Sequence, residues 1–468
     1  MPTSTSAPQT RSELAPEIFK AYDIRGIVDK TLTVDAVRLI GQAIGSEALD
    51  RGHNEIVIAR DGRLSGPALA AALAEGLMTA GCDVINVGMV PTPLLYFATH
   101  HLGTQSGVMV TGSHNPPDYN GLKMVLAGET LSGDTIQSLR QRIIDGRLHQ
   151  GAGGLKQDDV VDAYVKRVLS DVKLARPMRV VVDCGNGVAG AIAPRLLKAL
   201  GCELKELFCE VDGNFPNHHP DPSRPENLQD LIKALKGAPT DVGLAFDGDG
   251  DRLGVVSPNG SIIWADRQLI LFARDILERN PGAEIIYDVK CSRTLPTAIT
   301  EAGGQATMWK TGHSFIKAKL KASGAALAGE MSGHIFFKER WYGFDDGLYA
   351  AARLLEILSK DDRLPDEIFS DLPDTVNTPE LQLKMEEGAH HQLIKELVKA
   401  ASFPDAQVST IDGLRVDFDN GFGLVRASNT TPVLVFRFEA DDAATLSHIQ
   451  DQFRDLLNTT RSGLDLPF

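Results

Sequence analysis

The sequence predicts an α/β protein in which three related α/β domains with mixed sheets precede a smaller α+β C-terminal domain. The first observation is a repeated pattern, in which an apolar strand ends in an aspartate-containing turn and leads into a helix. The second is the spacing of the copies, which are anchored at Asp61, Asp183 and Asp288 and lie a domain length apart. The third is a change of pattern near Asp374. A chain of 468 residues has room for roughly three or four domains.

The three copies of the repeat have the same predicted order of strand and helix. Along the chain, the strand and helix pairs are 55–62 with 67–80, 179–185 with 192–200, and 284–290 with 295–302. In the first copy, Gly81 ends the helix and a second strand follows at 82–88, which completes a βαβ unit. Each copy also has a later strand that ends in a polar loop, and ligands of open α/β sheets bind beyond such strand ends.

The remaining segments are predicted from shorter signals. Tyr22–Gly26 is expected to be a turn that presents Arg25. After residue 374, we expect one amphipathic helix at 380–401, strands at 409–415, 415–419 and 432–439, and a last helix at 443–458. The predicted domains are 1–158, 159–261, 262–373 and 374–468, arranged around one central cleft.

Composition excludes several classes of partner. The formal charge of −15 argues against nucleic acid and against an anionic membrane surface. The segment 261–277 is the most apolar long stretch, but charged residues interrupt it, so it is not a membrane span. Residues 1–16 lack an apolar core, so no secretory signal is expected. Five cysteines without a CxxC pair fit a reducing compartment, and we therefore expect a cytoplasmic protein.

The most specific stretch is Thr-Gly-Ser-His-Asn-Pro-Pro-Asp-Tyr-Asn-Gly-Leu-Lys at 111–123. It follows the apolar run 107–110, which reads as a short buried strand. Ser113 is thus expected at the tip of a strand-to-loop turn, with His114 beside it and Lys123 ten residues later. α/β folds place reactive groups at such positions.

A second specific stretch is Asp-Gly-Asp-Gly-Asp-Arg at 247–252. Asp247, Asp249 and Asp251 alternate along the chain, which places like side chains on one side of an extended backbone. Three such carboxylates repel unless a cation lies between them, and hard divalent cations prefer oxygen ligands. An EF-hand is excluded because Arg252 and Pro258 occupy the places of its glycine and glutamate.

Two further loops carry groups that can recognise a sugar phosphate. Glu330, Ser332 and His334 provide a carboxylate, a hydroxyl and an imidazole, and a carboxylate can accept hydrogen bonds from two adjacent sugar hydroxyls. Near the other end of the chain, a guanidinium, hydroxyls and an amide cluster in one turn, as a phosphate dianion requires. These groups belong to Arg426, Ser428, Asn429 and Thr430.

Taken together, the four loops resemble those of the α-D-phosphohexomutases, in the family's order and over nearly the whole chain. The resemblance is to the bacterial phosphomannomutase/phosphoglucomutase members. It implies that Ser113 carries a phosphoryl group and that Mg²⁺ binds Asp247, Asp249, Asp251 and an oxygen of the phosphorylated serine. It also implies catalytic roles near the serine for His114, Lys123, Arg25, Arg252 and His334. The implied substrate contacts are Tyr22, Lys290, His313, Glu330, Ser332, Arg426, Ser428, Asn429 and Thr430.

The implied activity is reversible phosphoryl transfer between hexose 1-phosphates and hexose 6-phosphates of glucose and mannose. A hexose 1,6-bisphosphate would be the bound intermediate, and glucose 1,6-bisphosphate would be an activator. A general base is required, with Lys123, Arg25 and His334 as candidates, and Lys123 would need a lowered pKa. The expected partners are small sugar phosphates, and the chain is expected to be a monomer.

Three alternatives remain. Phosphoglucosamine mutase belongs to the same family, but its sugar loop typically has glutamine where this chain has Met331. A metal-dependent sugar-phosphate phosphatase could use the same serine and aspartates, although it would not need the phosphate-binding loop around Arg426. A non-catalytic scaffold is disfavoured because every reactive group of the four loops is intact.

Overall fold

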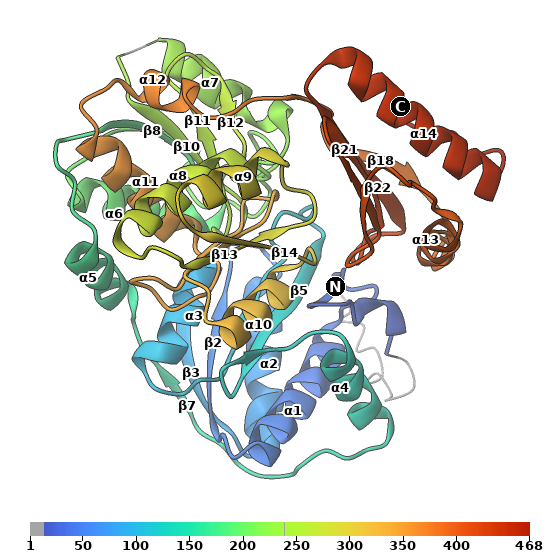
Figure 1. Cartoon of the computed structure of the whole chain (residues 1–468). Coiled ribbons are helices and arrows are strands. Elements are labelled where there is room, and N and C mark those ends of the chain that lie inside the picture. Colours follow the sequence, from blue (N-terminus) through green and yellow to red (C-terminus); the bar gives the residue numbers. More distant parts are fainter. Residues whose placement is uncertain (1–13, 238) are drawn as a thin grey trace. The chain divides into compact units, whose positions relative to one another are not determined.

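The computed structural model describes residues 14–237 and 239–468, which form two compact units (Figure 1). The first unit comprises the chain up to Ile263 together with Ser332–Ile368, and the second comprises Trp264–Met331 together with Phe369–Phe468. Among the described residues, no helix is both long and apolar enough to cross a membrane.

The first unit begins with a mixed seven-stranded sheet of order β1-β5-β4-β2-β3-β7, with β6 paired to β5. Strands β2, β3, β4 and β7 run parallel, whereas β1 and β5 are antiparallel to their neighbours. The strands are β1 (Ile24–Ile27), β2 (Glu55–Arg60), β3 (Asp83–Met89), β4 (Gly107–Val110), β5 (Tyr119–Leu126), β6 (Glu129–Thr130) and β7 (Leu155–Gln157).

Three helices of this part, at residues 34–50, 66–80 and 134–144, share one apolar core with the sheet, and Figure 1 shows them beside its strands. Thr33 caps the first of them by accepting a hydrogen bond from Ala36 N, and Gly81 ends the second in the left-handed conformation that glycine adopts without strain. Ile40, Leu73 and Ile58 belong to the shared core. The helices are α1 (Val34–Asp50), α2 (Gly66–Ala80), α3 (Thr92–His101), α4 (Asp134–Ile144) and α5 (Val161–Asp171).

The first unit also contains a mixed five-stranded sheet of order β12-β11-β10-β8-β9. The central β10 is parallel to β8 and antiparallel to β11, and its five residues are all buried. The strands are β8 (Arg179–Asp183), β9 (Glu203–Leu207), β10 (Val242–Phe246), β11 (Leu253–Val256) and β12 (Ile262–Ile263). Also in this unit are α6 (Ala193–Ala199), α7 (Gln229–Lys236), β16 (Ile335–Phe337) and α11 (Gly347–Lys360).

The second unit contains three parallel strands with helices packed against them, followed by an antiparallel sheet. The parallel part consists of β13 (Glu284–Asp288), β14 (Gln305–Trp309), β15 (Leu327–Gly329), α8 (Ala265–Arg279), α9 (Thr294–Glu301) and α10 (His313–Ser323). The antiparallel sheet has the order β17-β22-β21-β20-β19, with β18 paired to β22. The chain enters it through α12 (Pro365–Ser370).

Two helices cover the antiparallel sheet. Leu393 and Phe453 of the helices and Phe436 of the sheet belong to their shared core. The strands are β17 (Val376–Asn377), β18 (Leu381–Lys384), β19 (Gln407–Ser409), β20 (Leu414–Phe418), β21 (Gly421–Ala427) and β22 (Val433–Ala440), and the helices are α13 (Ala389–Ala400) and α14 (Ala443–Thr460).

The repeated strand and helix pairs lie where the sequence predicts them, but three local predictions are wrong. Tyr22–Gly26 is not only a turn, because Arg25 lies on β1, which pairs with β5. The predicted helix 380–401 is β18 followed by α13, since Leu381 and Leu383 alternate as in a strand and Gly388 begins the helix with φ 79°. The predicted strand 409–415 is interrupted, because Ser409 ends β19 and Leu414 begins β20, with a turn at Gly413, whose φ is 90°.

Candidate active site

Ser113 lies in the loop that follows β4, as predicted. Its side chain is buried, and its φ of 49° is in the left-handed region that non-glycine residues rarely adopt. Ser113 Oγ lies 3.1 Å from His114 Nδ1 and donates a hydrogen bond of 3.2 Å to Asp247 Oδ2. The serine hydroxyl therefore faces the acidic loop of the neighbouring sheet.

The acidic loop joins β10 to β11 and brings Asp247, Asp249 and Asp251 together. All three are fully buried, and one oxygen of each lies within 4.8 Å of the others. Gly250, with φ 75°, makes the turn that returns the chain to the sheet. Burial, followed by the Asp251 and Asp249 carboxylates, raises the pKa of Asp247 well above its usual range.

Lys123 on β5 contacts the same carboxylates. Its Nζ lies 2.8 Å from Asp249 Oδ2 and also bonds to Asp251 Oδ2. Burial alone would lower the pKa of Lys123, but Asp249 and Asp251 raise it above its usual value. The lowered pKa that Lys123 would need as a general base is not found in this arrangement, because the nearest neighbours of the ammonium are carboxylates.

Arg252 and His334 extend the cluster on its other side. Arg252 Nε lies 3.9 Å from Asp247 Oδ2 and donates a hydrogen bond of 3.2 Å to His334 Nε2. An isolated antiparallel bridge between Arg252 and His334 fixes the two backbones side by side. His334 Nδ1 lies 2.9 Å from Ser332 Oγ, which places this member of the predicted sugar loop beside the imidazole.

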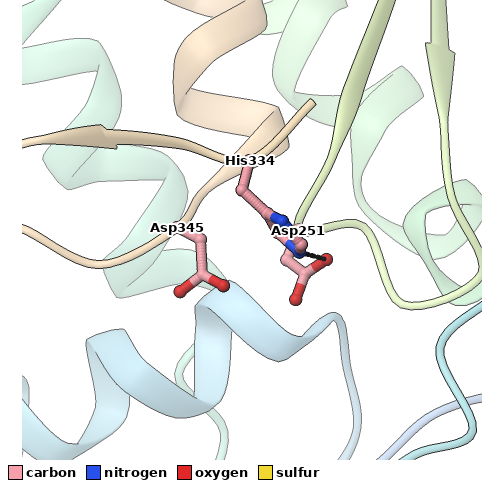
Figure 2. A group of neighbouring side chains, drawn as sticks. All are labelled: Asp251, His334 and Asp345. Atoms are coloured by element: carbon pink, nitrogen blue, oxygen red, sulfur yellow. Dashed lines mark ion pairs between the residues drawn. The ribbon is translucent and has the colours of Figure 1, made fainter. Parts of the chain in front are cut away.

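Figure 2 shows the His334 ring directed at the Asp251 carboxylate, with Asp345 next to them. His334 Nε2 lies 3.3 Å from Asp251 Oδ1, and all three side chains are buried with ligand atoms within 4.8 Å of one another. Asp345 is not part of any of the predicted motifs. The chain folds back after His334, and an antiparallel bridge between Phe336 and Asp345 brings Asp345 near the cluster. A proximity of this kind has no local sequence signal.

Arg25 reaches the serine loop from β1. Its guanidinium pairs with Asp23 at 2.5 Å and donates to Asn115 Oδ1. Burial, followed by Arg252 and Arg25, lowers the pKa of His114 well below its usual range, which favours the neutral imidazole. Tyr22 lies just before β1 and is half-buried. Thus Arg25, Ser113, His114, Lys123, the three aspartates, Arg252 and His334 all lie in the first unit.

The second unit holds the other predicted substrate contacts. Lys290 Nζ lies 3.0 Å from Glu380 Oε2, and this ammonium lowers the pKa of Glu380 to about 2. Glu330 Oε1 accepts a hydrogen bond of 2.5 Å from Gly312 N, directly before His313 at the start of α10. All of these side chains except Glu380 are buried.

Arg426 lies on β21, and the other predicted phosphate ligands follow it in the β21–β22 turn. Its guanidinium pairs with Asp412 at 3.1 and 3.3 Å. Ser428 Oγ accepts from the N–H groups of Thr430 and Thr431, each at 3.3 Å, which closes the turn on the Ser428 side chain. Asp412 and Glu380 were not predicted, because a single acidic residue in a loop has no distinguishing pattern.

The carboxylate cluster fits a hard divalent cation. The three aspartates provide closely spaced oxygens, and Asp249 Oδ1 is buried without a hydrogen bond to any described residue. Thr92 Oγ1 donates to Asp249 Oδ2 at 2.6 Å, and Lys123 Nζ lies 2.8 Å from the same oxygen, so this carboxylate is already oriented. An oriented carboxylate with an unsatisfied oxygen is what a metal ligand requires.

Comparisons with known proteins agree with this geometry. Four models of phosphoglucomutase/phosphomannomutase domains match, namely α/β/α domains I, II and III at residues 16–149, 161–260 and 264–376, and the C-terminal domain at residues 380–456. The chain is 57% identical over 455 residues to the phosphomannomutase/phosphoglucomutase of Pseudomonas aeruginosa, covering 97% of this chain and 98% of that protein. It is also 57% identical over 452 residues to a phosphoglucomutase of Neisseria gonorrhoeae, covering 96% and 98%.

A solved structure shows the same fold at high similarity. The crystal structure of a phosphoglucomutase/phosphomannomutase family protein from Burkholderia thailandensis superimposes with a TM-score of 0.93 at 58% identity, covering 97% of this chain and 100% of that one. The predicted fold class and the predicted family are thereby confirmed. The chain belongs to the phosphoglucomutase/phosphomannomutase family, the α-D-phosphohexomutases, and is an isomerase of that family.

Proposed function

We propose that this enzyme interconverts the 1-phosphates and 6-phosphates of glucose and mannose, with Ser113 as the phosphoryl carrier. One observation supports this most directly: the buried Ser113 Oγ donates to Asp247, a member of a three-carboxylate cluster flanked by Lys123 and Arg252. In this proposal, phosphorylated Ser113 transfers its phosphoryl group to the free hydroxyl of the substrate. The resulting hexose 1,6-bisphosphate then reorients and returns its other phosphoryl group to Ser113.

Asp247, Asp249 and Asp251 would hold Mg²⁺, and a phosphoryl oxygen on Ser113 would complete its ligands. The bound ion supplies positive charge that offsets charge on the transferring phosphoryl group. Arg252 and Arg25 would add donors from the protein, and positioning together with such charge provides most of the acceleration in phosphoryl transfer. Glucose 1,6-bisphosphate would act as an activator because it can phosphorylate Ser113 directly.

Lys123, Arg25 and His334 remain the candidates for moving the hydroxyl proton. Asp249 and Asp251 keep Lys123 in its ammonium form, which favours a proton-donating role for this residue. His334 Nδ1 is held by Ser332, and its Nε2 lies between Arg252 and Asp251. The neutral His114 would contribute a hydrogen bond to Ser113 and no charge.

Residues outside the serine and aspartate loops would bind the rest of the substrate. Arg426 with the Ser428–Thr430 turn would bind the non-reacting phosphate, since a guanidinium and nearby hydroxyl donors suit a dianion. Glu330 and Ser332 would contact two adjacent sugar hydroxyls. Lys290, His313 and Tyr22 would add further contacts.

We also propose domain boundaries at 158/159, 261/262 and 373/374, and a monomeric enzyme that acts on small sugar phosphates in the cytoplasm. The five cysteines are all free, which supports a reducing compartment. Size-exclusion chromatography with light scattering tests the oligomeric state, and limited proteolysis tests the boundaries.

Phosphoglucosamine mutase and a sugar-phosphate phosphatase are the competing activities. Met331 offers no polar side chain to an amine, which disfavours the first. The Arg426 turn disfavours the second, because hydrolysis of a monoester does not require a second phosphate site.

The central experiment follows the phosphoryl group. The enzyme is incubated with glucose 1,6-bisphosphate, its intact mass is measured, and the modified residue is located by peptide mapping. We expect the gain of one phosphoryl group on Ser113, and none in Ser113→Ala, which should keep its fold and lose mutase activity. A label on another residue, or net release of inorganic phosphate as the main reaction, would contradict the proposal.

A further inference from the structure

Arg63 is a fully buried arginine in the first unit that lies behind the loop of Ser113. It belongs to the segment between β2 and α2, and its side chain has no exposed surface. Nη2 donates to the carbonyl oxygens of Ser113 at 2.8 Å and Asn115 at 2.6 Å. Nη1 donates to those of Pro116 at 2.5 Å and Tyr119 at 3.0 Å. One guanidinium therefore fixes four carbonyl groups of a single loop.

Asp61 completes this arrangement and provides the opposite charge. Its Oδ2 lies 3.3 Å from Arg63 Nε and accepts from Gly112 N at 3.0 Å and Thr111 Oγ1 at 2.8 Å. Its Oδ1 accepts from Arg63 N at 3.0 Å. Thr111 Oγ1 in turn accepts from Ser113 N at 2.8 Å. The N–H and the carbonyl of Ser113 are thus both held, one through Thr111 and the other by Arg63.

The packing around the guanidinium leaves little room for movement. A Cβ on Gly112 would lie 2.3 Å from Arg63 Nε, and the Phe215 ring covers Arg63 Cζ at 5.1 Å. On the other side of the loop, a Cβ on Gly248 would lie 2.3 Å from Ser113 O. The serine carbonyl is therefore enclosed between the guanidinium and the backbone of the metal loop.

The conformation that these contacts hold is an unfavourable one. Ser113 has a φ of 49°, and a non-glycine residue stays in that region only where its surroundings over-determine it. In this conformation Ser113 Oγ is directed at Asp247. Without the carbonyl contacts, the loop could relax to an ordinary φ, which would turn the hydroxyl away from the carboxylates.

We propose that Arg63 is a positioning residue that fixes the direction of Ser113 Oγ for phosphoryl transfer, with Asp61 as its counter-charge. This inference rests on the proposed function, because it takes Ser113 as the phosphoryl carrier. Lysine cannot replace Arg63 in this role. Its ammonium is a single point of charge, whereas the planar guanidinium directs separate N–H groups at separate carbonyls.

The test compares Arg63→Lys and Arg63→Met with the unchanged enzyme. The measurements are kcat, KM and the rate at which Ser113 gains a phosphoryl group from glucose 1,6-bisphosphate, followed by intact mass. We expect kcat and that rate to fall by about a hundredfold, the effect of a misplacement of about 1 Å. KM should stay within about threefold, because Arg63 does not contribute to uniform substrate binding.

Arg353→Met is the matched control for a loss of stability. Arg353 is also a fully buried arginine of the first unit, paired with Glu339 at 3.1 Å and Glu356 at 3.5 Å. The comparison is made at temperatures at which Arg353→Met and the Arg63 variant have equal folded fractions. There, Arg353→Met should have the kcat and the rate of serine phosphorylation of the unchanged enzyme. Equal losses in both variants, or a wild-type kcat in Arg63→Lys, would overturn the proposal.

A further variant keeps the test decisive if the Arg63 variants do not fold. Asp61→Asn removes the counter-charge and one acceptor from the same network, and should lower kcat and the rate of serine phosphorylation without changing KM. Wild-type values in Asp61→Asn would then overturn the role of this pair. If the unchanged enzyme gains no phosphoryl group on Ser113, the proposed function itself has failed, which is a different outcome from failure of the Arg63 role alone.

Discussion

Lys123 Nζ lies 2.8 Å from Asp249 Oδ2, and the two residues come from different sheets of the first unit. Both side chains are almost completely buried, so the pair is strongly coupled. The ammonium therefore neutralises the same two carboxylates, Asp249 and Asp251, that a bound cation would neutralise. A metal bound as proposed would therefore share these carboxylates with Lys123.

Removal of the lysine should change metal dependence as well as activity. Breaking one partner of a buried ion pair costs about 3–5 kcal/mol. Lys123→Met should thus lower Tm in the presence of a chelator. Mg²⁺ should raise the Tm of the variant more than that of the unchanged enzyme, because the ion replaces the lost positive charge. Activity should fall by at least about a hundredfold. Differential scanning fluorimetry with and without Mg²⁺ measures the effect.

Lys156→Met is the control for the Lys123 variant. Lys156 is 61% exposed and lies 3.5 Å from Glu55, so its removal should shift Tm by about 1 °C or less. An identical response of Lys123→Met and the unchanged enzyme to Mg²⁺ would contradict the shared-carboxylate arrangement.

Metal removal should abolish turnover. A chelator should reduce the mutase rate to background, and Mg²⁺ should restore it, because the proposed ion would offset charge on the transferring phosphoryl group. Calorimetric titration should show one Mg²⁺ per chain, with Kd at least about tenfold weaker in Asp249→Asn, since a charged ligand is lost. Full activity of a metal-stripped sample would contradict the proposal that these aspartates bind a catalytic metal ion.

Arg426 should affect both substrate orientations equally. Each charge-assisted hydrogen bond is worth about 1.5–3 kcal/mol, so Arg426→Ala should lower kcat/KM for the 1-phosphate and the 6-phosphate by at least about tenfold. Arg437 on the adjacent β22 is also buried and pairs with Asp266 at 3.3 Å, and Arg437→Met serves as the control for stability. A loss confined to one substrate would contradict a shared phosphate site.

His218 should make the stability of the first unit depend on pH. Its Nε2 lies 3.1 Å from both oxygens of the buried Asp183. Burial alone would lower the pKa of His218, but the Asp183 carboxylate raises it by more than burial lowers it. The pKa of His218 in the folded protein is therefore above 6.5. A raised pKa contributes stability that is fully present below 6.5 and is lost as pH rises through the folded pKa.

The variant His218→Gln should therefore lower Tm by about 2 °C or more near pH 5.5 and by much less near pH 9. His53→Gln is the control, because the ring of His53 lies 3.3 Å from the carbonyl oxygen of Thr104 and not beside a carboxylate. Equal losses for His218→Gln at both pH values would show that the ion pair does not contribute.

The family and the positions of the four loops could be predicted because each loop is a contiguous segment with a specific sequence. Ser113 and the three aspartates follow predicted strands, but their roles were implied by the family resemblance and stay predictions. Arg63, Asp345 and Asp412 could not be found in this way, because each acts through partners distant in sequence or across a folded-back segment. Arg25 was misplaced in a turn for a related reason, since β1 exists only through its pairing with β5.

The C-terminal errors have a local cause. Residues Leu381–Lys384 alternate apolar and polar side chains over only four positions, which a helical window can also accommodate. In the folded protein, antiparallel pairing with β22 makes this segment a strand. The strand that carries Arg426 was missed because its glycines obscure the alternation, although Gly423 packs directly against Phe453.

The last prediction concerns the choice of sugar, and it begins with the residues of the sugar loop. Glu330 and Ser332 can contact two adjacent ring hydroxyls, which the family resemblance assigns to carbons 3 and 4. Glucose and mannose share these hydroxyls and differ at carbon 2. An intermediate that reorients must bind in two poses, so carbon 2 occupies two places and a tight contact in one pose would be lost in the other. A site that does not bind this hydroxyl discriminates weakly, whereas a site built to bind it could discriminate by several powers of ten.

We therefore expect kcat/KM for glucose 1-phosphate and mannose 1-phosphate to differ by less than about a hundredfold, or roughly 2.7 kcal/mol. Glucosamine 1-phosphate should be a poor substrate, because Met331 provides no polar partner for its amine. Met331→Gln should raise kcat/KM for glucosamine 1-phosphate relative to glucose 1-phosphate, and Met331→Leu, which is apolar, should not. A coupled assay of the three 1-phosphates on the three proteins decides between these outcomes. The interpretation of the loop is wrong if the unchanged enzyme prefers glucosamine 1-phosphate or does not use mannose 1-phosphate at all.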